Sequence, residues 1–440
     1  MTPIKIDLLI NCQWIIPIVP ENKILHNCAL AVDKDRVLGI FPQVDANKRF
    51  SARTVKHLDQ HILMPGLVNS HGHAAMSLLR GYADDLALES WLKDQIWPAE
   101  KLFVSEEFVH DGTRLSIAEM IKTGTTCFAD MYFFQDSIAE EVRNAGIRSQ
   151  IGFTVLDFPT AFGEDADDYI HKGLAFRDRW NDHPLIKVAC APPAPYSVSD
   201  DALKKISIYA NELDMPIHMH CHETANEVLE SIDIYGVRPL QRLNDLGILL
   251  PQTQLVHMTQ ITNNDIGLLQ DHQCHVIHCP ESNLKLASGF CPISKLIDHG
   301  INAAIGTDSA ASNNDLDMFG EMRTAAIVAK AVAGDPSAVP AHQALEMATI
   351  NSARAMGLAD QIGSLEINKC ADITAIDLDH LNTLPMNNPT SHIVYAMKSS
   401  QVTNVWCNGQ AVLKNGELKT IDPAMIRENT ERWRRKFLGV

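Results

Sequence analysis

The middle of the chain, residues 61–363, alternates short apolar segments with longer helical ones. Eight of the apolar segments have the length of a buried strand, and eight strand–helix units over about 300 residues are typical of a (β/α)8 barrel. A doubly wound open sheet is the structural alternative. The barrel is favoured because polar residues end many of the strands and would converge on one of its faces. The expected strands are 66–70, 125–130, 148–154, 186–191, 216–220, 254–257, 274–278 and 302–306.

The two ends of the chain share a different pattern, in which short runs rich in Ile, Leu and Val are separated by Asn, Asp and Lys. We therefore expect residues 1–60 and 364–420 to form one small β-sandwich domain beside the barrel. Residues 421–440 are expected to hold a C-terminal helix that begins near Pro423, with Asp422 as its N-cap. The strands and hairpin turns expected at the two ends are 4–12, 28–32, 36–41, 372–377, 402–406, Asn408-Gly409 and Asn415-Gly416.

Composition and charge narrow the range of partners. Hydrophobic residues make up 46% of the 440 residues, which is enough for a large core, and the formal net charge is −17. No run of Lys or Arg forms a basic stripe, so electrostatic attraction does not favour binding to nucleic acids or anionic membranes. A small molecule is the expected partner. The ten cysteines form no C-x-x-C pair, and the N-terminus lacks a basic region followed by a long apolar one. We expect a soluble, cytoplasmic homo-oligomer without a membrane segment.

Histidines and one aspartate at the ends of expected strands indicate a metal site. His71 and His73 end the first apolar run of the barrel, and residues two apart in a strand share a face. His220 ends the fifth strand and Asp308 follows the eighth. Three imidazoles and a carboxylate at one end of a barrel fit a divalent metal such as zinc or iron(II). One ion is expected, because barrels of this kind that bind two ions usually have a bridging lysine at the end of the fourth strand. Here Lys187 opens that strand, at the opposite end of the barrel.

Four further histidines and a glutamate each have a structural interpretation beside a functional one. His218 lies deeper in the fifth strand and is expected in the core, whereas His222 is expected on the loop that follows. His278 ends the seventh strand, where a structural role is favoured. Glu223 either starts a helix or moves protons to a heteroaromatic nitrogen beside a metal-bound water. His257 ends the sixth strand and is either a core histidine or a hydrogen-bond partner of a metal hydroxide.

Together these residues resemble the amidohydrolase superfamily and, more narrowly, the 5'-methylthioadenosine/S-adenosylhomocysteine deaminases. The resemblance runs from about residue 7 to residue 418. It implies that His71, His73, His220 and Asp308 bind the metal, and that Asp308 also takes a proton from the bound water. The segments that carry the resemblance are 65–73, 92–100, 220–227, 282–289 and 306–314.

The same resemblance implies the remaining roles. Glu223 would contact the purine edge and deliver a proton to N1, and His257 would steady the hydroxide. Glu100 would accept hydrogen bonds from the ribose hydroxyls, which suits a carboxylate that faces a vicinal diol. Trp91 and Ser312 match positions near the base.

Two departures from the family pattern bear on the substrate. Pro193 stands where the family usually has a histidine in the loop after the fourth strand, so one purine or ribose contact is lost or supplied elsewhere. Members that accept S-adenosylhomocysteine have arginines after the third strand, whereas here Phe153 and Phe158 lead into the acidic segment 163–168. Arg148 opens that strand and is expected at the far end of the barrel. A negative, apolar mouth favours a thiomethyl group over a carboxylate.

The sequence therefore predicts a metal-dependent aminohydrolase that removes the 6-amino group of an adenine nucleoside as ammonia. 5'-Methylthioadenosine is the favoured substrate, with S-adenosylhomocysteine and adenosine as further ones. A deaminase or hydrolase of another heterocycle, such as guanine, cytosine or a triazine, is the alternative on the same fold. A catalytically inactive binding protein is a third hypothesis, but the intact ligands together with Glu223 and His257 argue against it.

Overall fold

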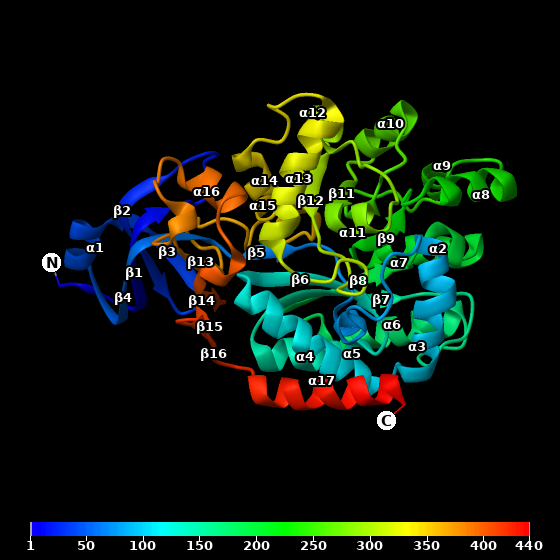
Figure 1. The fold of residues 1–440 in the computed structure, drawn as a ribbon, viewed down its shortest axis with the longest axis horizontal. Coiled ribbons are helices and arrows are strands. Elements are labelled where there is room, and N and C mark those ends of the chain that lie inside the picture. The colour runs from blue at the N-terminus through cyan, green and yellow to red at the C-terminus, as the bar shows by residue number, and fades with distance from the viewer. Residues whose placement is uncertain (1, 440) are drawn as a thin grey trace.

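The computed structural model describes residues 2–439, and within them the strands form two sheets of eight (Figure 1). The sheet at the right of Figure 1 is parallel throughout, and helices surround it. The sheet at the left is built from both ends of the chain. The predicted fold class, a (β/α)8 barrel with a small β domain built from both termini, is confirmed, although the strands of the expected β-sandwich are joined in one sheet of eight. Between residues 2 and 439, no helix combines the length and the apolar content that crossing a membrane requires.

The barrel strands follow one another in chain order around the sheet. Each lies within two residues of its predicted bounds, because a short apolar run between polar turns is a strong signal for a buried parallel strand. The strands are β5 (Leu67–Asn69), β6 (Thr125–Tyr132), β7 (Arg148–Thr154), β8 (Ile186–Ala191), β9 (Ile217–Cys221), β10 (Thr253–His257), β11 (His275–His278) and β12 (Asn302–Ile305).

The barrel closes between β5 and β12 through the residues at their carboxyl ends. The amide of Ser70 donates to the carbonyl oxygen of Ile305 at 3.0 Å. One step further along, the Asn69 amide side chain donates to Oγ1 of Thr307 at 2.7 Å and accepts from its backbone N–H at 3.0 Å. These side-chain and backbone bonds hold the first and last strands together at the end where the predicted ligands lie.

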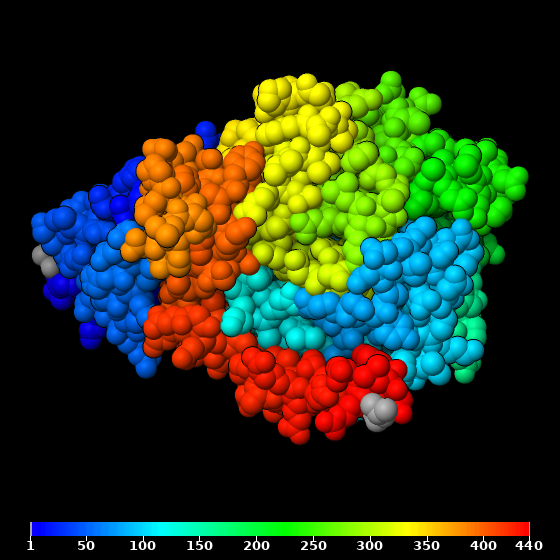
Figure 2. Space-filling view, in the orientation of Figure 1, coloured from blue at the N-terminus to red at the C-terminus, as the bar shows by residue number. Residues whose placement is uncertain are grey.

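Helices pack around the barrel, and a long segment between β5 and α4 lies over part of its surface. This segment contains η1 (Ala74–Leu79), α2 (Leu88–Ser90), the π-helical turn η2 (Trp91–Ile96) and α3 (Trp97–Phe103). In Figure 2 it is the light blue surface between the green helices and the red C-terminal helix. The other helices of the barrel are α4 (Glu106–Lys122), α5 (Gln135–Ala145), α6 (Ala166–Trp180), η3 (Pro195–Ser197), α7 (Asp200–Glu212), α8 (Ala225–Tyr235), α9 (Pro239–Asp245), α10 (Asn263–Asp271), α11 (Pro280–Lys285), α12 (Ile293–Asp298), α13 (Met318–Ala333), α14 (Ala341–Met347) and α15 (Ile350–Ala355).

The second sheet joins the two termini through the long strand β4 (Phe50–Pro65), which pairs with β1 on one side and β13 on the other. Its predicted hairpins are confirmed: Asn408 and Asn415 have φ values of 50° and 53°, and the glycine that follows each has φ of 78° and 77°. Two successive left-handed residues are what a type I′ turn requires. The other elements are β1 (Ile4–Ile15), β2 (Leu25–Asp33), β3 (Arg36–Pro42), α1 (Gln43–Arg49), β13 (Ile373–Asp377), η4 (Leu381–Thr383), α16 (Pro389–Tyr395), η5 (Ser399–Gln401), β14 (Val402–Cys407), β15 (Gln410–Lys414) and β16 (Glu417–Leu418).

The C-terminal helix α17 (Pro423–Leu438) lies against the barrel helix α4 (Figure 1). Asp422 caps its N-terminus as predicted, by accepting from the backbone N–H of Ala424. Trp433 is buried and donates its indole N–H to Asp111 of α4 at 2.8 Å. Asn429 donates to the other carboxylate oxygen of Asp111 at 2.7 Å, so one buried carboxylate holds the helix in place.

Candidate active site

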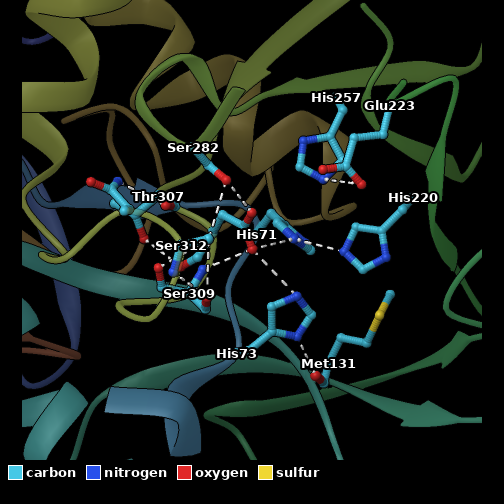
Figure 3. Close-up of polar contacts among 12 residues, drawn as sticks. His71, His73, Met131, His220, Glu223, His257, Ser282, Thr307, Ser309 and Ser312 are labelled. Carbon is cyan, nitrogen blue, oxygen red and sulfur yellow. Dashed lines mark hydrogen bonds and ion pairs between the residues drawn. The ribbon is translucent and has the colours of Figure 1, made fainter. Parts of the chain in front are cut away.

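Four side chains from three parts of the chain converge at the carboxyl end of the barrel. His71 and His73 follow β5, His220 lies in β9 and Asp308 follows β12. Within residues 2–439 these four are identified as a group able to hold a metal ion, with ligand atoms that all lie within 4.8 Å of one another. Figure 3 shows the three imidazoles turned toward one another. The structure thus brings together the four residues predicted as ligands.

The distances between the facing atoms fit a divalent cation. Nε2 of His71 lies 3.1 Å from Nε2 of His220, and Nε2 of His71 and of His73 each lie 3.4 Å from Oδ1 of Asp308. Ligands of a tetrahedral zinc ion, bound at 2.0–2.1 Å, are separated by roughly 3.4 Å. The Nδ1 atoms of the imidazoles point away to other partners, which leaves lone pairs on the facing Nε2 atoms. Lone pairs at this distance repel unless a cation lies between them, so the site fits a divalent metal.

Each ligand imidazole is oriented by a hydrogen bond from its outer nitrogen, as is usual for metal-binding histidines. The partners are the carbonyl oxygen of Met131 for His73, the carbonyl oxygen of Pro193 for His220 and Nε2 of His218 for His71, each at 2.7 Å. Pro193, which departs from the family pattern, therefore orients a ligand through its backbone carbonyl, and this contact does not depend on its side chain. His218 lies below the ligands in the barrel core, as predicted.

Asp308 is held by several polar groups and by an unusual backbone. Its Oδ2 accepts from Oγ of Ser282 at 2.6 Å, and its Oδ1 accepts from the backbone N–H of Ser309 at 2.7 Å. Burial alone would raise the pKa of Asp308, but its hydrogen bonds and charge interactions with His71 and His73 outweigh burial and hold that pKa well below its usual value. Its φ is 60°, a left-handed conformation that non-glycine residues rarely adopt and that is common at functional sites.

Glu223 and His257 face each other beside the four ligands (Figure 3). Oε2 of Glu223 lies 3.7 Å from Nε2 of His257, whose Nδ1 lies 2.8 Å from Oδ1 of Asn283. Burial raises the pKa of Glu223, while the nearby His257 acts against that rise. A buried carboxyl group with a raised pKa, facing an imidazole, is a common arrangement in general acid–base catalysis.

A different glutamate occupies the helix-start role that the sequence allowed for Glu223. The carboxylate of Glu227 accepts from the backbone N–H groups of His222 and Glu223 at 2.9 and 2.7 Å. Thr224 caps α8 by accepting from the N–H of Glu227. The side chain of Glu223 is not used in the helix cap and points toward His257 instead.

The residues predicted to bind substrate each make polar contacts of their own. Glu100 of α3 accepts from the hydroxyl of Tyr132 at 2.7 Å, and Trp91 donates to the carbonyl oxygen of Ala83 at 3.1 Å. Ser312 is buried, and its Oγ lies 3.1 Å from Oγ of Ser282. Tyr132 was not predicted, although a polar residue at the end of the second barrel strand is a usable signal.

The two other histidines have structural surroundings. His222 is fully buried, and its Nε2 accepts from the backbone N–H of Leu240, which ties the loop after β9 to α9. His278 is buried at the end of β11, and burial lowers its pKa to about 3. Neither belongs to the group of four ligands.

The region after β7 differs from the predicted apolar and negative mouth. Phe153 is 1% exposed and packs against Gly173 of α6, outside the barrel, so its placement at the mouth was wrong. Asp168 pairs with Lys172 at 2.7 Å, which neutralises part of the acidic segment. Arg148 pairs with Asp372 at 3.3 Å at the far end of the barrel, as predicted.

Comparisons with known proteins agree with this geometry. Residues 62–412 match the model of the Amidohydrolase family. The 5-methylthioadenosine/S-adenosylhomocysteine deaminase of Teredinibacter turnerae is 50% identical over 432 residues, which cover 98% of this chain and 98% of that protein. The protein of the same name from Saccharophagus degradans is 50% identical over 431 residues, covering 98% and 97%. The zinc-bound crystal structure of an adenosine deaminase from Xanthomonas campestris is similar with a TM-score of 0.98 and 46% identity, and the match covers 100% of both chains.

Proposed function

The chain belongs to the amidohydrolase family, and from that premise we propose that it is a deaminase that replaces the 6-amino group of an adenine nucleoside with oxygen and releases ammonia. The observation that carries the proposal is the Glu223–His257 pair, 3.7 Å apart beside four metal ligands. Whole-length identity of 50% to the deaminases of two bacteria supports the same reaction. The ten cysteines are all unpaired, which is consistent with a purine-salvage enzyme of the reducing cytoplasm.

One zinc ion is the proposed cofactor, with iron(II) as the other candidate. His71, His73, His220 and Asp308 would hold it, and the three-nitrogen, one-oxygen donor set suits a borderline metal. When bound, the metal supplies Lewis acidity that lowers the pKa of water in the site toward about 7.

The chain's own residues would move the protons. Asp308 accepts a proton from the attacking water, and Glu223 delivers one to N1 of the purine as the oxygen adds to C6. Glu223 then relays the proton of the C6 hydroxyl to the amino group, which leaves as ammonia, and the proton on Asp308 returns to Glu223. One water is consumed for each ammonia released. Nε2 of His257 would contact the oxygen at C6, while Oδ1 of Asn283 lies 2.8 Å from the other ring nitrogen, Nδ1, and holds the imidazole in place. General acid–base catalysis of this kind typically raises the rate by about 10²-fold to 10⁴-fold.

5'-Methylthioadenosine is the proposed preferred substrate. Glu100, which Tyr132 holds at 2.7 Å, would accept from the ribose hydroxyls, and Trp91 and Ser312 would lie near the base. No arginine or lysine occurs in residues 155–171, the segment that follows β7, and Lys172, the first cation beyond it, is already paired with Asp168 at 2.7 Å. An amino-acid carboxylate would therefore meet no free cation in this segment. A 5'-thiomethyl group carries no charge and needs no such partner.

Ammonia release from a substrate panel tests the proposal. The panel holds 5'-methylthioadenosine, adenosine, S-adenosylhomocysteine, guanine, cytosine and an amino-triazine, each given to the zinc-loaded protein. We expect ammonia from the adenine nucleosides, with the adenine absorbance converted to that of hypoxanthine. Faster release from guanine, cytosine or the triazine would favour the alternative hydrolase, and no release from any compound would favour a binding protein.

A further inference from the structure

We propose that His218, Gln254 and Gln150 form a buried relay of hydrogen bonds that fixes the tautomer of His71 and thereby sets the affinity of the metal site. The relay runs from the floor of the barrel up to the ligands. The inference rests on the metal-binding part of the proposed function, and it does not depend on the substrate.

The relay crosses the interior of the barrel between three strands. Gln254 of β10 lies directly opposite His218 of β9 in the parallel register, and Gln150 comes from β7. The side chains are between 0% and 2% exposed, so water does not compete for their hydrogen bonds. Nδ1 of His218 lies 2.6 Å from Oε1 of Gln254, and Nε2 of His218 lies 2.7 Å from Nδ1 of His71.

The direction of every bond follows from one backbone carbonyl. The carbonyl oxygen of Ala355, at the end of α15, can only accept, and Nε2 of Gln254 lies 2.8 Å from it. Nε2 of Gln254 also donates to Oε1 of Gln150 at 3.0 Å, while Oε1 of Gln254 accepts from Nε2 of Gln150 at 2.9 Å. The Gln254 amide therefore cannot be flipped, and its oxygen must face His218.

The tautomers of the two histidines follow from this orientation. Because an amide oxygen faces it, Nδ1 of His218 must carry the hydrogen, and a neutral imidazole has only one N–H. Nε2 of His218 is then an acceptor, so Nδ1 of His71 must donate to it. The lone pair of His71 is left on Nε2, the atom that faces His220 at 3.1 Å. The opposite tautomer of His218 would set two N–H groups against each other.

His71 differs from the other two histidine ligands in how it is held. His73 and His220 each donate to a backbone carbonyl oxygen, an acceptor that no substitution of a side chain removes. The orientation of His71 instead depends on the side chains of His218, Gln254 and Gln150, which come from three different strands. Partners of this kind typically change metal affinity by about 10-fold to 100-fold when removed.

Zinc binding to the chelator-stripped full chain, measured by competition with a chromogenic zinc chelator, tests the relay. We expect His218→Phe and Gln254→Met to weaken zinc binding by about 10-fold to 100-fold. His218→Gln keeps an amide oxygen near the position of Nε2 and is expected to recover most of the affinity. His275→Phe is the matched control, because His275 also lies in a barrel strand but has an Nδ1 without a hydrogen-bond partner among the described residues. It should bind zinc as the wild type does.

Two results would overturn the relay. One is unchanged zinc affinity in Gln254→Met, which keeps the length of glutamine, cannot accept strongly, and carries the test even if His218→Phe does not fold. The other is an equal loss in folded His218→Phe and His218→Gln, which would indicate packing alone. Failure of the proposed function would show differently, as zinc-loaded wild-type protein that releases no ammonia from adenine nucleosides.

Discussion

Replacing Glu223 with glutamine should abolish proton transfer and change little else. The two side chains have nearly the same shape, and Glu223 is not one of the four ligands, so Glu223→Gln should keep its metal. Its amide can still pack beside Ser288 and His257, which lie 3.5 and 3.7 Å from the carboxylate oxygens. An amide does not exchange protons near neutral pH, so the defect should appear in turnover.

The magnitude follows from how completely Glu223 is enclosed. General acid–base catalysis typically contributes 10²-fold to 10⁴-fold, which corresponds to roughly 2.7–5.4 kcal/mol of transition-state stabilisation. The residue is 8% exposed, and burial raises its pKa, so bulk water has little access to replace it. We therefore expect the loss in kcat to lie in the upper half of that range, at about 10³-fold or more.

Steady-state ammonia release and elemental analysis of the same samples measure the effect. Glu230→Gln, which makes the same chemical change on an exposed position of α8, is the matched control and should keep wild-type turnover. A 6-chloro analogue still needs a proton at N1 but none on its leaving chloride, so the Glu223→Gln defect should persist and be smaller with that substrate. Turnover within tenfold of the wild type in a metal-loaded Glu223→Gln enzyme would refute the assigned role.

Three further predictions concern the metal, the substrate and pH. His220→Ala should lose both metal and activity, while the wild type carries about one ion per chain by elemental analysis; two tightly bound ions per active chain would contradict a single-metal site. The kcat/KM for 5'-methylthioadenosine should exceed that for S-adenosylhomocysteine by roughly tenfold or more, since each 1.4 kcal/mol of differential binding gives a factor of ten, and equal values would mean that a cation reaches the mouth. The carboxylates of Asp111 and Glu141, 3.8 and 2.7 Å from the ring nitrogens of His110, raise its pKa to about 9. Because that value lies above the unfolded value of about 6.5, the stability from His110 should be fully present below pH 6.5 and lost as pH rises through 9. The difference in unfolding free energy between wild type and His110→Gln should shrink over this range, and a constant difference would contradict it.

The barrel strands and the convergence of His71, His73, His220 and Asp308 were predictable because they depend on local patterns. A short apolar run predicts a buried strand, and a polar residue that follows it is predicted to lie at the carboxyl end of the barrel. The long strand β4 was missed because the run from Ser51 to Lys56 is mostly polar and largely exposed and carries little strand signal.

The placement of Phe153 failed because the sequence did not give the direction in which the residues of β7 point. Side chains alternate along a strand, and Gln150 of β7 points into the barrel, where it meets Gln254. Phe153, an odd number of positions away, therefore points outward to α6. The relay below His71 was equally hidden, because its members are far apart in the sequence and meet only once the barrel has closed.

The closure between β5 and β12 makes the metal a part of the fold's integrity as well as of its chemistry. The same two chain segments that join the first and last strands, at Ser70 and Thr307, continue directly into ligands His71 and Asp308. An ion bound there links the two ends of the sheet and adds binding free energy to the folded state alone. Without the ion, the contact between β5 and β12 is held by its hydrogen bonds alone. Amide exchange and proteolytic cleavage should therefore begin where these two strands meet. Cellular supply of the ion would then govern how long the protein survives as well as how fast it works.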